Sequence, residues 1–308
     1  MTKQPGNTHG VFFSANDKVL AWSVPFLTSF RIHNPEMPLC LIPFDQNVSL
    51  TKALADQFDF SIFEHDSFGA LEQIGRKLEL GHSEYGPHWF RRYASFWGPF
   101  DRFLYLDARQ VILSDLTEFV TAPERFGLEF VYYDTVLNQV YEPGPMRCNL
   151  LVKGGARGFN SGRWASQKGL FSLTSFQKSA QVQLSLRDQL NARNTDQAFI
   201  NFCCDEAAVN MAKISDLLGD VVSSGWARQS GHPYQDDDGI WRLWDHGGND
   251  HKRRLLLMHW AGYRMEDPLP HARLLRRYGG RSRTSLWASM RKFLAANRKI
   301  RKLIGRPA

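Results

Sequence analysis

The chain has 308 residues, 43% of them hydrophobic and 22% charged, which is an ordinary globular composition and enough material for one large domain. No apolar run approaches the ~18 residues that span a bilayer, and the polar stretch from Met1 to Gly10 is not an export signal. The four cysteines lack the CxxC spacing of a zinc or redox site. We therefore expect a protein of the reducing cytoplasm.

Strand and helix patterns alternate in the first hundred residues. Apolar runs at 10–14 and 39–44 predict strands on either side of an amphipathic helix at about 18–33. In this helix Pro25 predicts either a kink or a start near Ser23. The pattern continues with predicted helices at about 48–57, 68–80 and 87–97 and predicted strands at 59–63 and 102–106. Such alternation predicts an α/β fold whose sheet is mostly parallel and covered by helices on both faces.

The pattern is looser in the second half of the chain. Strands are predicted at 128–133, 148–152 and 254–260, and helices at about 172–187 and 195–204. The span from about 225 to 251 is polar and rich in Gly and Asp, which indicates a long loop able to act as a lid. We expect a single α/β domain with a central mixed sheet over residues 1–267.

Basic charge is concentrated in the remaining segment, residues 268–308. After Asp267 the chain has 12 Arg and Lys residues and no acidic one, although the net charge of the whole chain is only +7. From residue 284 on, apolar side chains recur on roughly one face of a predicted helix, at positions 286, 290, 293, 300 and 304. A basic amphipathic helix suits an anionic membrane surface, which would make this a peripheral protein at the inner face of a membrane. The alternative is a helix packed on the body. Nucleic acid is not an expected partner, because aromatic residues are not interleaved with the basic ones.

The most informative segment runs from Phe103 to Leu113. A buried-strand pattern is followed by Asp107, Ala108 and Arg109 and then by further apolar residues. Open α/β sheets bind ligands at the carboxyl edge, so Asp107 marks the expected position of a site. Side chains two residues apart in an extended segment point the same way, so Asp107 and Arg109 should face one space.

Five other segments place polar residues at turns or helix starts. They are Ser14-Ala15-Asn16-Asp17, Phe90-Arg91-Arg92-Tyr93, Phe159-Asn160-Ser161-Gly162, Asp196-Gln197 and Met258-His259-Trp260. Each alone also fits a plain structural role, such as a helix cap, a tight turn or an acidic first turn of a helix. Their order around Tyr105-Leu106-Asp107-Ala108-Arg109 resembles that of nucleotide-sugar glycosyltransferases of the GT-A fold, particularly family eight and its bacterial relatives.

The resemblance covers roughly residues 10–265. It implies a GT-A fold with a Rossmann-like N-terminal half. It also implies transfer of a sugar from a nucleoside-diphosphate donor, with UDP as the nucleotide, to a hydroxyl group of a glycan, lipid or protein acceptor, with retention of configuration.

The same resemblance assigns a role to each candidate residue. The nucleotide would be bound by Ala15, Asn16, Asp17, Arg92 and Asp107, with Arg91 as the alternative to Arg92. The diphosphate would be held by Arg109, His259 and Arg264, and the sugar by Asn160, Ser161 and Gly162. Asp196 and Gln197 would be the catalytic residues.

The DxD motif of these enzymes is altered here. In the family its two carboxylates hold Mn²⁺ or Mg²⁺ against the diphosphate, whereas this chain has Arg109 in the second position. A guanidinium can stabilise the charge of a departing diphosphate, as a metal ion does. We therefore expect metal dependence to be weakened or absent. If a metal is bound, the resemblance implies Asp107 and His259 as its ligands.

Other function classes are excluded or remain as alternatives. A dinucleotide-dependent oxidoreductase needs a GxGxxG turn after the first strand, and a serine hydrolase of the α/β type needs a GxSxG elbow; the chain has neither. Two alternatives remain. One is a catalytically impaired relative that binds a sugar nucleotide or a glycan without transfer, and the other is a protein that acts on anionic surfaces through its basic tail.

Overall fold

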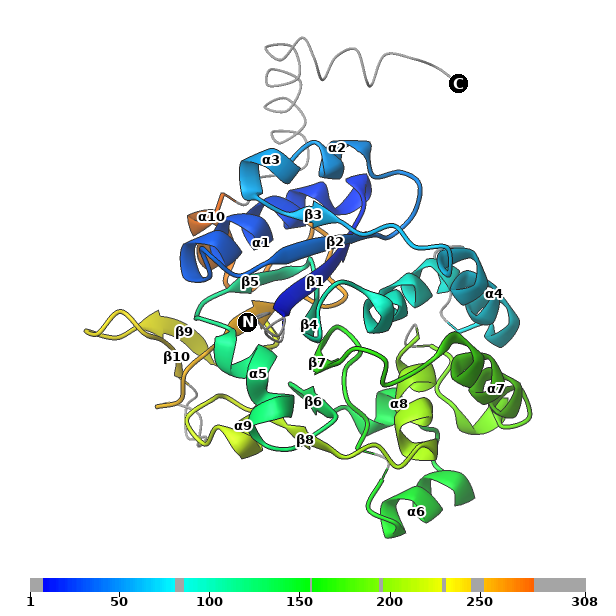
Figure 1. Cartoon of the computed structure of the whole chain (residues 1–308). Coiled ribbons are helices and arrows are strands. Elements are labelled where there is room, and N and C mark those ends of the chain that lie inside the picture. Colours follow the sequence, from blue (N-terminus) through cyan, green and yellow to red (C-terminus); the bar gives the residue numbers. More distant parts are fainter. Residues whose placement is uncertain are drawn as a thin grey trace, which may run out of the picture.

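The computed structural model describes residues 8–80, 86–155, 157–193, 196–228, 231–244 and 252–279. Its centre is a seven-stranded sheet with the strand order β3-β2-β1-β4-β7-β6-β8 (Figure 1). The strands are β1 (His9–Ala15), β2 (Leu39–Pro43), β3 (Ser61–Ile62), β4 (Arg102–Asp107), β6 (Phe130–Tyr132), β7 (Arg163–Gln167) and β8 (Met211–Lys213). All neighbouring strands are parallel except β7, which is antiparallel to β4 and β6. The expected α/β class with a mixed, mostly parallel sheet is confirmed.

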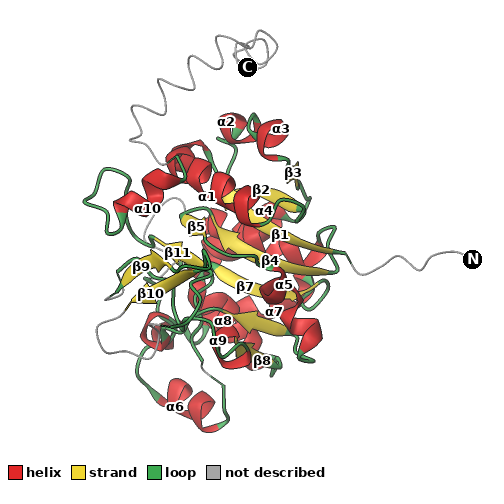
Figure 2. Ribbon diagram, turned by 90° about the vertical axis from the view of Figure 1, so that its left-hand side faces the viewer, coloured by secondary structure: helices red, strands yellow, loops and turns green. Residues whose placement is uncertain are grey.

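Helices cover both faces of the sheet (Figure 2). The α-helices are α1 (Leu20–His33), α2 (Ser49–Lys52), α3 (Ala55–Phe58), α4 (Phe68–Leu78), α5 (Thr117–Arg125), α6 (Pro145–Val152), α7 (Leu173–Leu184), α8 (Gln197–Glu206), α9 (Ile214–Leu217) and α10 (Ala272–Arg277). Four 3₁₀ segments accompany them, η1 (Asp17–Val19), η2 (Gly86–Trp97), η3 (Leu137–Gln139) and η4 (Arg187–Gln189).

The two faces of the sheet form separate apolar cores. Because side chains alternate along a strand, Phe13 of β1 packs with Phe26 of α1 on one face. Phe12 lies on the other face and contacts Phe103 of β4, in the core that also contains Phe90 of η2. The buried, continuous apolar pattern of β1 and β4 is the reason that both strands could be found in the sequence.

Two small antiparallel sheets lie beside the central one. Strand β5 (Gln110–Ile112) begins soon after Asp107 and pairs with β11 (Leu257–His259), so that His259 lies opposite Gln110. Strands β9 (His232–Gln235) and β10 (Trp241–Trp244) form a hairpin. The β5–β11 pairing carries a late part of the chain to the end of β4.

Three sequence-based expectations about elements are wrong. The strand expected at 148–152 belongs to helix α6, whose apolar residues are largely exposed, Val152 to 88%. Residues 225–251 are not one loop, because their described part contains the β9–β10 hairpin. Helix α1 starts at Leu20, so Pro25 lies within it and not in its first turn.

The described chain continues past residue 267 into helix α10. Leu274 and Leu275 of α10 belong to the same core as β1, and the Tyr278 hydroxyl lies 3.1 Å from His33 Nε2. The domain division at residue 267 stays a prediction. The amphipathic helix predicted from residue 284 lies outside the described residues. Of the helices within the described ranges, none combines the length and apolar character needed to cross a bilayer.

Candidate active site

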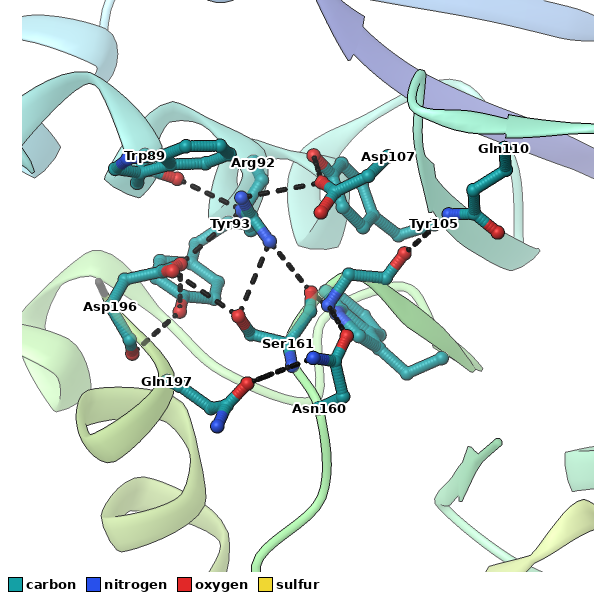
Figure 3. A network of polar contacts seen from close by, with 12 residues as sticks. Trp89, Arg92, Tyr93, Tyr105, Asp107, Gln110, Asn160, Ser161, Asp196 and Gln197 are labelled. Carbon is teal, nitrogen blue, oxygen red and sulfur yellow. Dashed lines mark hydrogen bonds and ion pairs between the residues drawn. The ribbon is translucent and has the colours of Figure 1, made fainter. Parts of the chain in front are cut away.

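A cavity of about 580 Å³ lies at the carboxyl ends of β1 and β4. Open α/β sheets bind ligands at this edge. Figure 3 shows the polar network beside the cavity. Ten of the site residues expected from the sequence line it: Ala15, Asn16, Arg92, Asp107, Arg109, Asn160, Ser161, Gly162, Gln197 and His259. Residues distant in the sequence are therefore brought together here.

Arg92 is the centre of the polar network (Figure 3). Its side chain is only 2% exposed, and its guanidinium carbon lies 4.8 Å from the ring centroid of Trp89 and 4.9 Å from that of Tyr105. It forms ion pairs with Asp107 (3.4 Å) and Asp196 (3.3 Å). Burial alone lowers the pKa of Arg92, but these two carboxylates raise it above its usual value. A permanent positive charge is thus fixed at the cavity wall.

The neighbouring Arg91 points elsewhere. Its Nε donates to Glu72 Oε1 at 2.6 Å and its Nη1 donates to the Pro43 carbonyl at 3.1 Å. The choice of Arg92 over Arg91 as the residue near the ligand agrees with this geometry. Both arginines are buried.

Asp107 ends β4 at the edge of the cavity. The Tyr105 hydroxyl donates to Asp107 Oδ1 at 3.1 Å, and the Asp107 amide donates to the Gly162 carbonyl at 2.9 Å. A Cβ atom at Gly162 would lie 2.4 Å from Asp107 Oδ2, closer than real Cβ contacts allow. Glycine is therefore required at position 162 by the close approach of this carboxylate.

Arg109, in the second position of the altered motif, also lines the cavity. Asp107 and Arg109 thus line the same cavity, as the sequence indicated. The Arg109 Nη1 donates to the Tyr263 carbonyl at 3.3 Å, and burial lowers the pKa of the guanidinium. Arginine nevertheless stays protonated in proteins, so the charge remains.

His259 lines the cavity from β11 and is 4% exposed. Burial lowers the pKa of His259 well below its usual value, and the charges of Arg163, Arg109 and Arg92 lower it further. The imidazole is therefore neutral at physiological pH. Its Nδ1 atom has no hydrogen-bond partner among the described residues.

The charges around the cavity are mostly positive. Among the described residues, its lining contains one carboxylate, Asp107, and five cationic side chains: Lys18, Arg92, Arg109, Arg193 and Arg228. Three of the cations, Lys18, Arg193 and Arg228, are exposed. The cavity is therefore electrostatically suited to an anion.

The same residues do not fit a divalent metal ion. Mg²⁺ and Mn²⁺ prefer several oxygen ligands, whereas the one carboxylate of the lining is already ion-paired with Arg92. Within the described ranges, no group of three or more His, Cys, Asp or Glu side chains is placed to hold a metal. Asp107 and His259 are the only carboxylate and imidazole of the described lining, and the charges of three arginines act on that imidazole.

Gln197 and Asp196 begin helix α8 but have different surroundings. Gln197 lines the cavity, and its Oε1 accepts from Asn160 Nδ2 at 3.1 Å and from the Ser161 amide at 3.3 Å. Asp196 is fully buried and does not line the cavity. It accepts from the Tyr93 hydroxyl at 2.5 Å and from Ser161 Oγ at 3.2 Å. Asp196 thus contacts Arg92 and Ser161 behind the cavity wall, and its catalytic role stays a prediction.

Two further expected site residues also lie off the cavity. The carboxylate of Asp17 accepts from the amides of Leu50 (3.1 Å) and Thr51 (2.9 Å) in the first turn of α2. It stabilises that helix start instead of facing a ligand. Arg264 is exposed and does not line the cavity. It is near enough to Arg109 for its charge to lower the Arg109 pKa, whereas the charge of Asp107 raises that pKa.

Ser14 and Ala108, which belong to segments noted in the sequence, also line the cavity. The structure adds residues that the sequence did not single out. They are Lys18, Val19, Phe44, Trp89, Gln139, Arg193, Trp226, Arg228, Ala261 and Gly262. Trp226 is held by a hydrogen bond from its indole to Asp134, and Arg228 lies 4.7 Å above the Tyr263 ring. Trp89 was detectable, because it directly precedes the Phe90-Arg91-Arg92-Tyr93 segment. The others carry no local signal and reach the cavity only through the tertiary fold.

Comparison with known proteins gives the class of this fold. No protein-family model and no curated protein sequence matches the chain. The bifunctional glycosyltransferase WbbM matches with a TM-score of 0.54 at 10% identity, over 93% of this chain and 52% of that protein. This chain therefore spans about half the length of WbbM. The strand arrangement and this match identify the GT-A type of glycosyltransferase fold.

Two other glycosyltransferase structures match less closely. The galactosyltransferase LgtC, solved with donor and acceptor sugar analogues, has a TM-score of 0.49 at 13% identity, over 87% of this chain and 93% of its own. Mouse xyloside xylosyltransferase 1 has a TM-score of 0.48 at 15% identity, over 67% and 84% respectively. At such identities the likeness concerns the fold.

Proposed function

We propose that this protein is a glycosyltransferase that moves a sugar from a nucleoside-diphosphate donor, with UDP as the nucleotide, to a hydroxyl group of a glycan, lipid or protein acceptor. The observation that carries the proposal is the cationic cavity at the carboxyl edge of a glycosyltransferase-type sheet. Five cations around one paired carboxylate complement a diphosphate, whose negative charge grows as the sugar leaves.

Each part of the donor has matching residues in the cavity. Ala15 and Asn16, at the end of β1, would contact the nucleoside, and the Asn16 side chain is held by a 2.7 Å hydrogen bond to Asp45. Arg109 and the neutral His259 would hold the diphosphate. The sugar would lie against Gln197 and the turn formed by Asn160, Ser161 and Gly162, whose amides and side chains are fixed by mutual hydrogen bonds.

The lining also favours retention of the anomeric configuration. In the reaction, the bond between the sugar C1 and the diphosphate oxygen breaks and its electron pair stays on that oxygen. The acceptor hydroxyl oxygen bonds to C1 on the same face, and its proton passes to the departing diphosphate. Such a step needs no protein base, in keeping with a described lining whose one carboxylate, Asp107, is paired with Arg92.

We extend the proposal to the role of Arg109. A guanidinium about 4 Å from a phosphate oxygen attracts it by up to about 4 kcal/mol at an effective dielectric constant of 20. Arg109 and Arg92 would therefore supply part of the charge stabilisation for which related enzymes use Mn²⁺ or Mg²⁺. Binding of the donor would then persist without metal.

A second candidate function is binding of a sugar nucleotide or glycan without transfer. The observation in its favour is the burial of Asp196, which removes one of the two expected catalytic side chains from contact with a ligand. Release of UDP from a UDP-sugar, to water or to an acceptor, would favour the enzyme. Tight binding of UDP-sugars with no release of UDP would favour the binder.

The direct test is a thermal-shift series with uridine, UMP, UDP and UDP-sugars in excess chelator, repeated with Mn²⁺. A ligand that binds only the folded state raises the melting temperature. We expect UDP and its sugars to give a larger shift than UMP, and uridine to give little, because the cavity selects for phosphate charge. Equal shifts by uridine and UDP, or none by any nucleotide, would contradict the proposal.

We also propose that the protein works in the cytoplasm at the inner face of a membrane, with its basic tail on anionic lipid. The support is the sequence of residues 268–308, with 12 basic residues and no acidic one. Co-sedimentation should be stronger with anionic than with neutral vesicles and should weaken when residues 284–308 are deleted. Equal pelleting with both kinds of vesicle would argue against a membrane role.

A further inference from the structure

A second cavity, of about 560 Å³, lies between the β9–β10 hairpin and helix α10. Figure 2 shows the hairpin beside α10, and residues of β9, β10 and α10 all line the cavity. The cavity shares no lining residue with the candidate active site. Its lining consists of His232, Pro233, Trp241, His271, Ala272, Arg273, Leu274, Arg276 and Arg277.

The polar side chains of this lining are all basic. Three guanidinium groups and two imidazoles line the cavity, together with apolar surface from Pro233, Trp241 and Leu274, and the part of the lining that the structure describes contains no Asp or Glu. The Arg277 Nη2 donates to the neutral Gln235 Oε1 at 3.3 Å, and its guanidinium carbon lies 5.2 Å from the Trp241 ring centroid. Neither contact neutralises its charge.

The lack of acidic partners distinguishes these arginines from others in the chain. Arg163 pairs with Asp134 at 2.7 Å, and Arg254 pairs with both Asp220 and Glu118. By contrast, no described carboxylate pairs with Arg273, Arg276 or Arg277.

Two histidines near these arginines have lowered pKa values. Burial lowers the pKa of His33, and the charge of Arg277 lowers it further. Burial likewise lowers the pKa of His271, with a smaller contribution from His232, whose ring centroid lies 6.0 Å away. Arg273, Arg276 and Arg277 are exposed, and their like charges repel each other around the cavity, so a bound anion would relieve the repulsion.

We propose that this cavity is a second binding site, specific for a phosphate group. The planar guanidinium fork matches two phosphate oxygens at once, and several forks around one cavity favour phosphate over a singly charged carboxylate. The apolar surface of Pro233, Trp241 and Leu274 would accept the carbon skeleton next to the phosphate. The ligand is thus a phosphorylated molecule, either free in solution or a lipid headgroup.

The second site is tied to the first by a short stretch of chain. His259 of β11 lines the active-site cavity, and the Trp260 indole donates to the Pro270 carbonyl at 2.8 Å, just before α10. A phosphorylated acceptor or a membrane bound at α10 would therefore be attached to the same segment that completes the active site. The phosphate site itself does not depend on the proposed transferase activity.

The test is calorimetric titration of inorganic phosphate into the full-length protein, the double variant Arg276→Gln/Arg277→Gln and the control Arg125→Gln/Arg187→Gln. The control loses the same charge from exposed arginines that pair with Glu118 and Glu79. We expect phosphate binding at α10 to weaken at least tenfold in the first variant and to stay within twofold in the control. Melting temperatures check that both variants fold.

The variant Arg109→Gln separates this site from the active site. It should weaken only phosphate binding in the first cavity and leave binding at α10 unchanged, whether or not the protein is a transferase. Unaltered phosphate titrations in a folded Arg276→Gln/Arg277→Gln variant would overturn the proposal. An equal loss in the charge-matched control would also overturn it, because the effect would then be one of net charge.

Vesicles identify the source of the phosphate group. Phosphatidic acid in a phosphatidylcholine background supplies the same group on a membrane. If the site binds a headgroup, Arg276→Gln/Arg277→Gln should reduce pelleting with these vesicles more than the control does. If both variants pellet alike while soluble phosphate still discriminates between them, the ligand is a free phosphorylated molecule.

Discussion

Replacement of Arg109 by Gln is the sharpest perturbation of the candidate active site. Arg109 lines the cavity, and the one hydrogen bond of its side chain among the described residues is the 3.3 Å contact with the Tyr263 carbonyl. Its other donors are therefore available to a diphosphate. A hydrogen bond to a charged group contributes about 1.5–3 kcal/mol. The variant should therefore bind UDP about ten to one hundred times more weakly in excess chelator.

Calorimetry with UDP is the assay, and Arg125→Gln is the control because that exposed arginine lies on α5, away from the cavity. The stability of Arg109→Gln should be unchanged or higher, since removal of a buried charge relieves a desolvation cost. The variant Arg109→Asp provides the converse test. It restores two carboxylates two residues apart, so Mn²⁺ should strengthen its UDP binding.

Two results would refute the reasoning about Arg109. One is a wild-type protein whose UDP binding disappears in chelator and returns with Mn²⁺. The other is an Arg109→Gln variant that binds UDP as tightly as the wild type.

Three further predictions concern the surroundings of the cavity. Gly162→Ala places a methyl group against the Asp107 carboxylate and should lower the free energy of unfolding by about 1–3 kcal/mol, and an unchanged urea midpoint would show that the carboxylate can move away. Asp196→Asn leaves Arg92 without one of its two buried partners, so urea unfolding should show a loss of about 3–5 kcal/mol; a fully stable variant would mean that Asp107 alone suffices. The pKa of His259 is lowered well below 6.5 in the folded state. Below pH 6.5 the unfolded state therefore binds a proton at this residue that the folded state does not bind, and the free energy of unfolding falls as the pH drops. His259→Asn should reduce this slope by up to about 1.4 kcal/mol per pH unit, and identical pH profiles for variant and wild type would contradict the buried neutral imidazole.

The elements that frame the site could be predicted because their sequences carry strong local signals. The inner residues of β1 (11–13) and of β4 (103–106) are all apolar, since both faces of these strands are buried, and polar residues follow where each strand leaves the sheet. The same reasoning indicated that Asp107 and Arg109 share one space, and both line the cavity.

Strand β7 escaped prediction because its sequence looks like that of a polar surface segment. Arg163 and Ser166 are fully buried in it, and groups distant in the sequence provide the partners of Arg163 Nη2 and Ser166 Oγ. Arg163 pairs with Asp134, and Ser166 Oγ donates to the Glu129 carbonyl at 2.7 Å. Such partners are far apart in the sequence and leave no periodic trace.

The β9–β10 hairpin was not predicted, although, unlike β7, it carries a local sequence signal. Its turn is polar and contains Gly239 with a φ of 78°, which a glycine adopts readily. The Asp-Gly pair at 238–239, between segments with aromatic residues, is a hairpin signal.

The roles expected for Asp17 and Asp196 show a further limit of prediction from the sequence. A carboxylate at a helix start satisfies backbone amides or buried hydroxyls as readily as it serves a ligand, and only the tertiary contacts decide between them.

The pairing of β11 with β5 has a consequence for the order in which parts of the protein are completed during synthesis. The central sheet is complete once β8 has been made, at residue 213, but His259 reaches the end of β4 only after some forty-five further residues have been synthesised. The strands of the central sheet are therefore synthesised well before the last residues that line the cavity. A chain that ended in that interval would contain these strands but lack His259, Ala261 and Gly262.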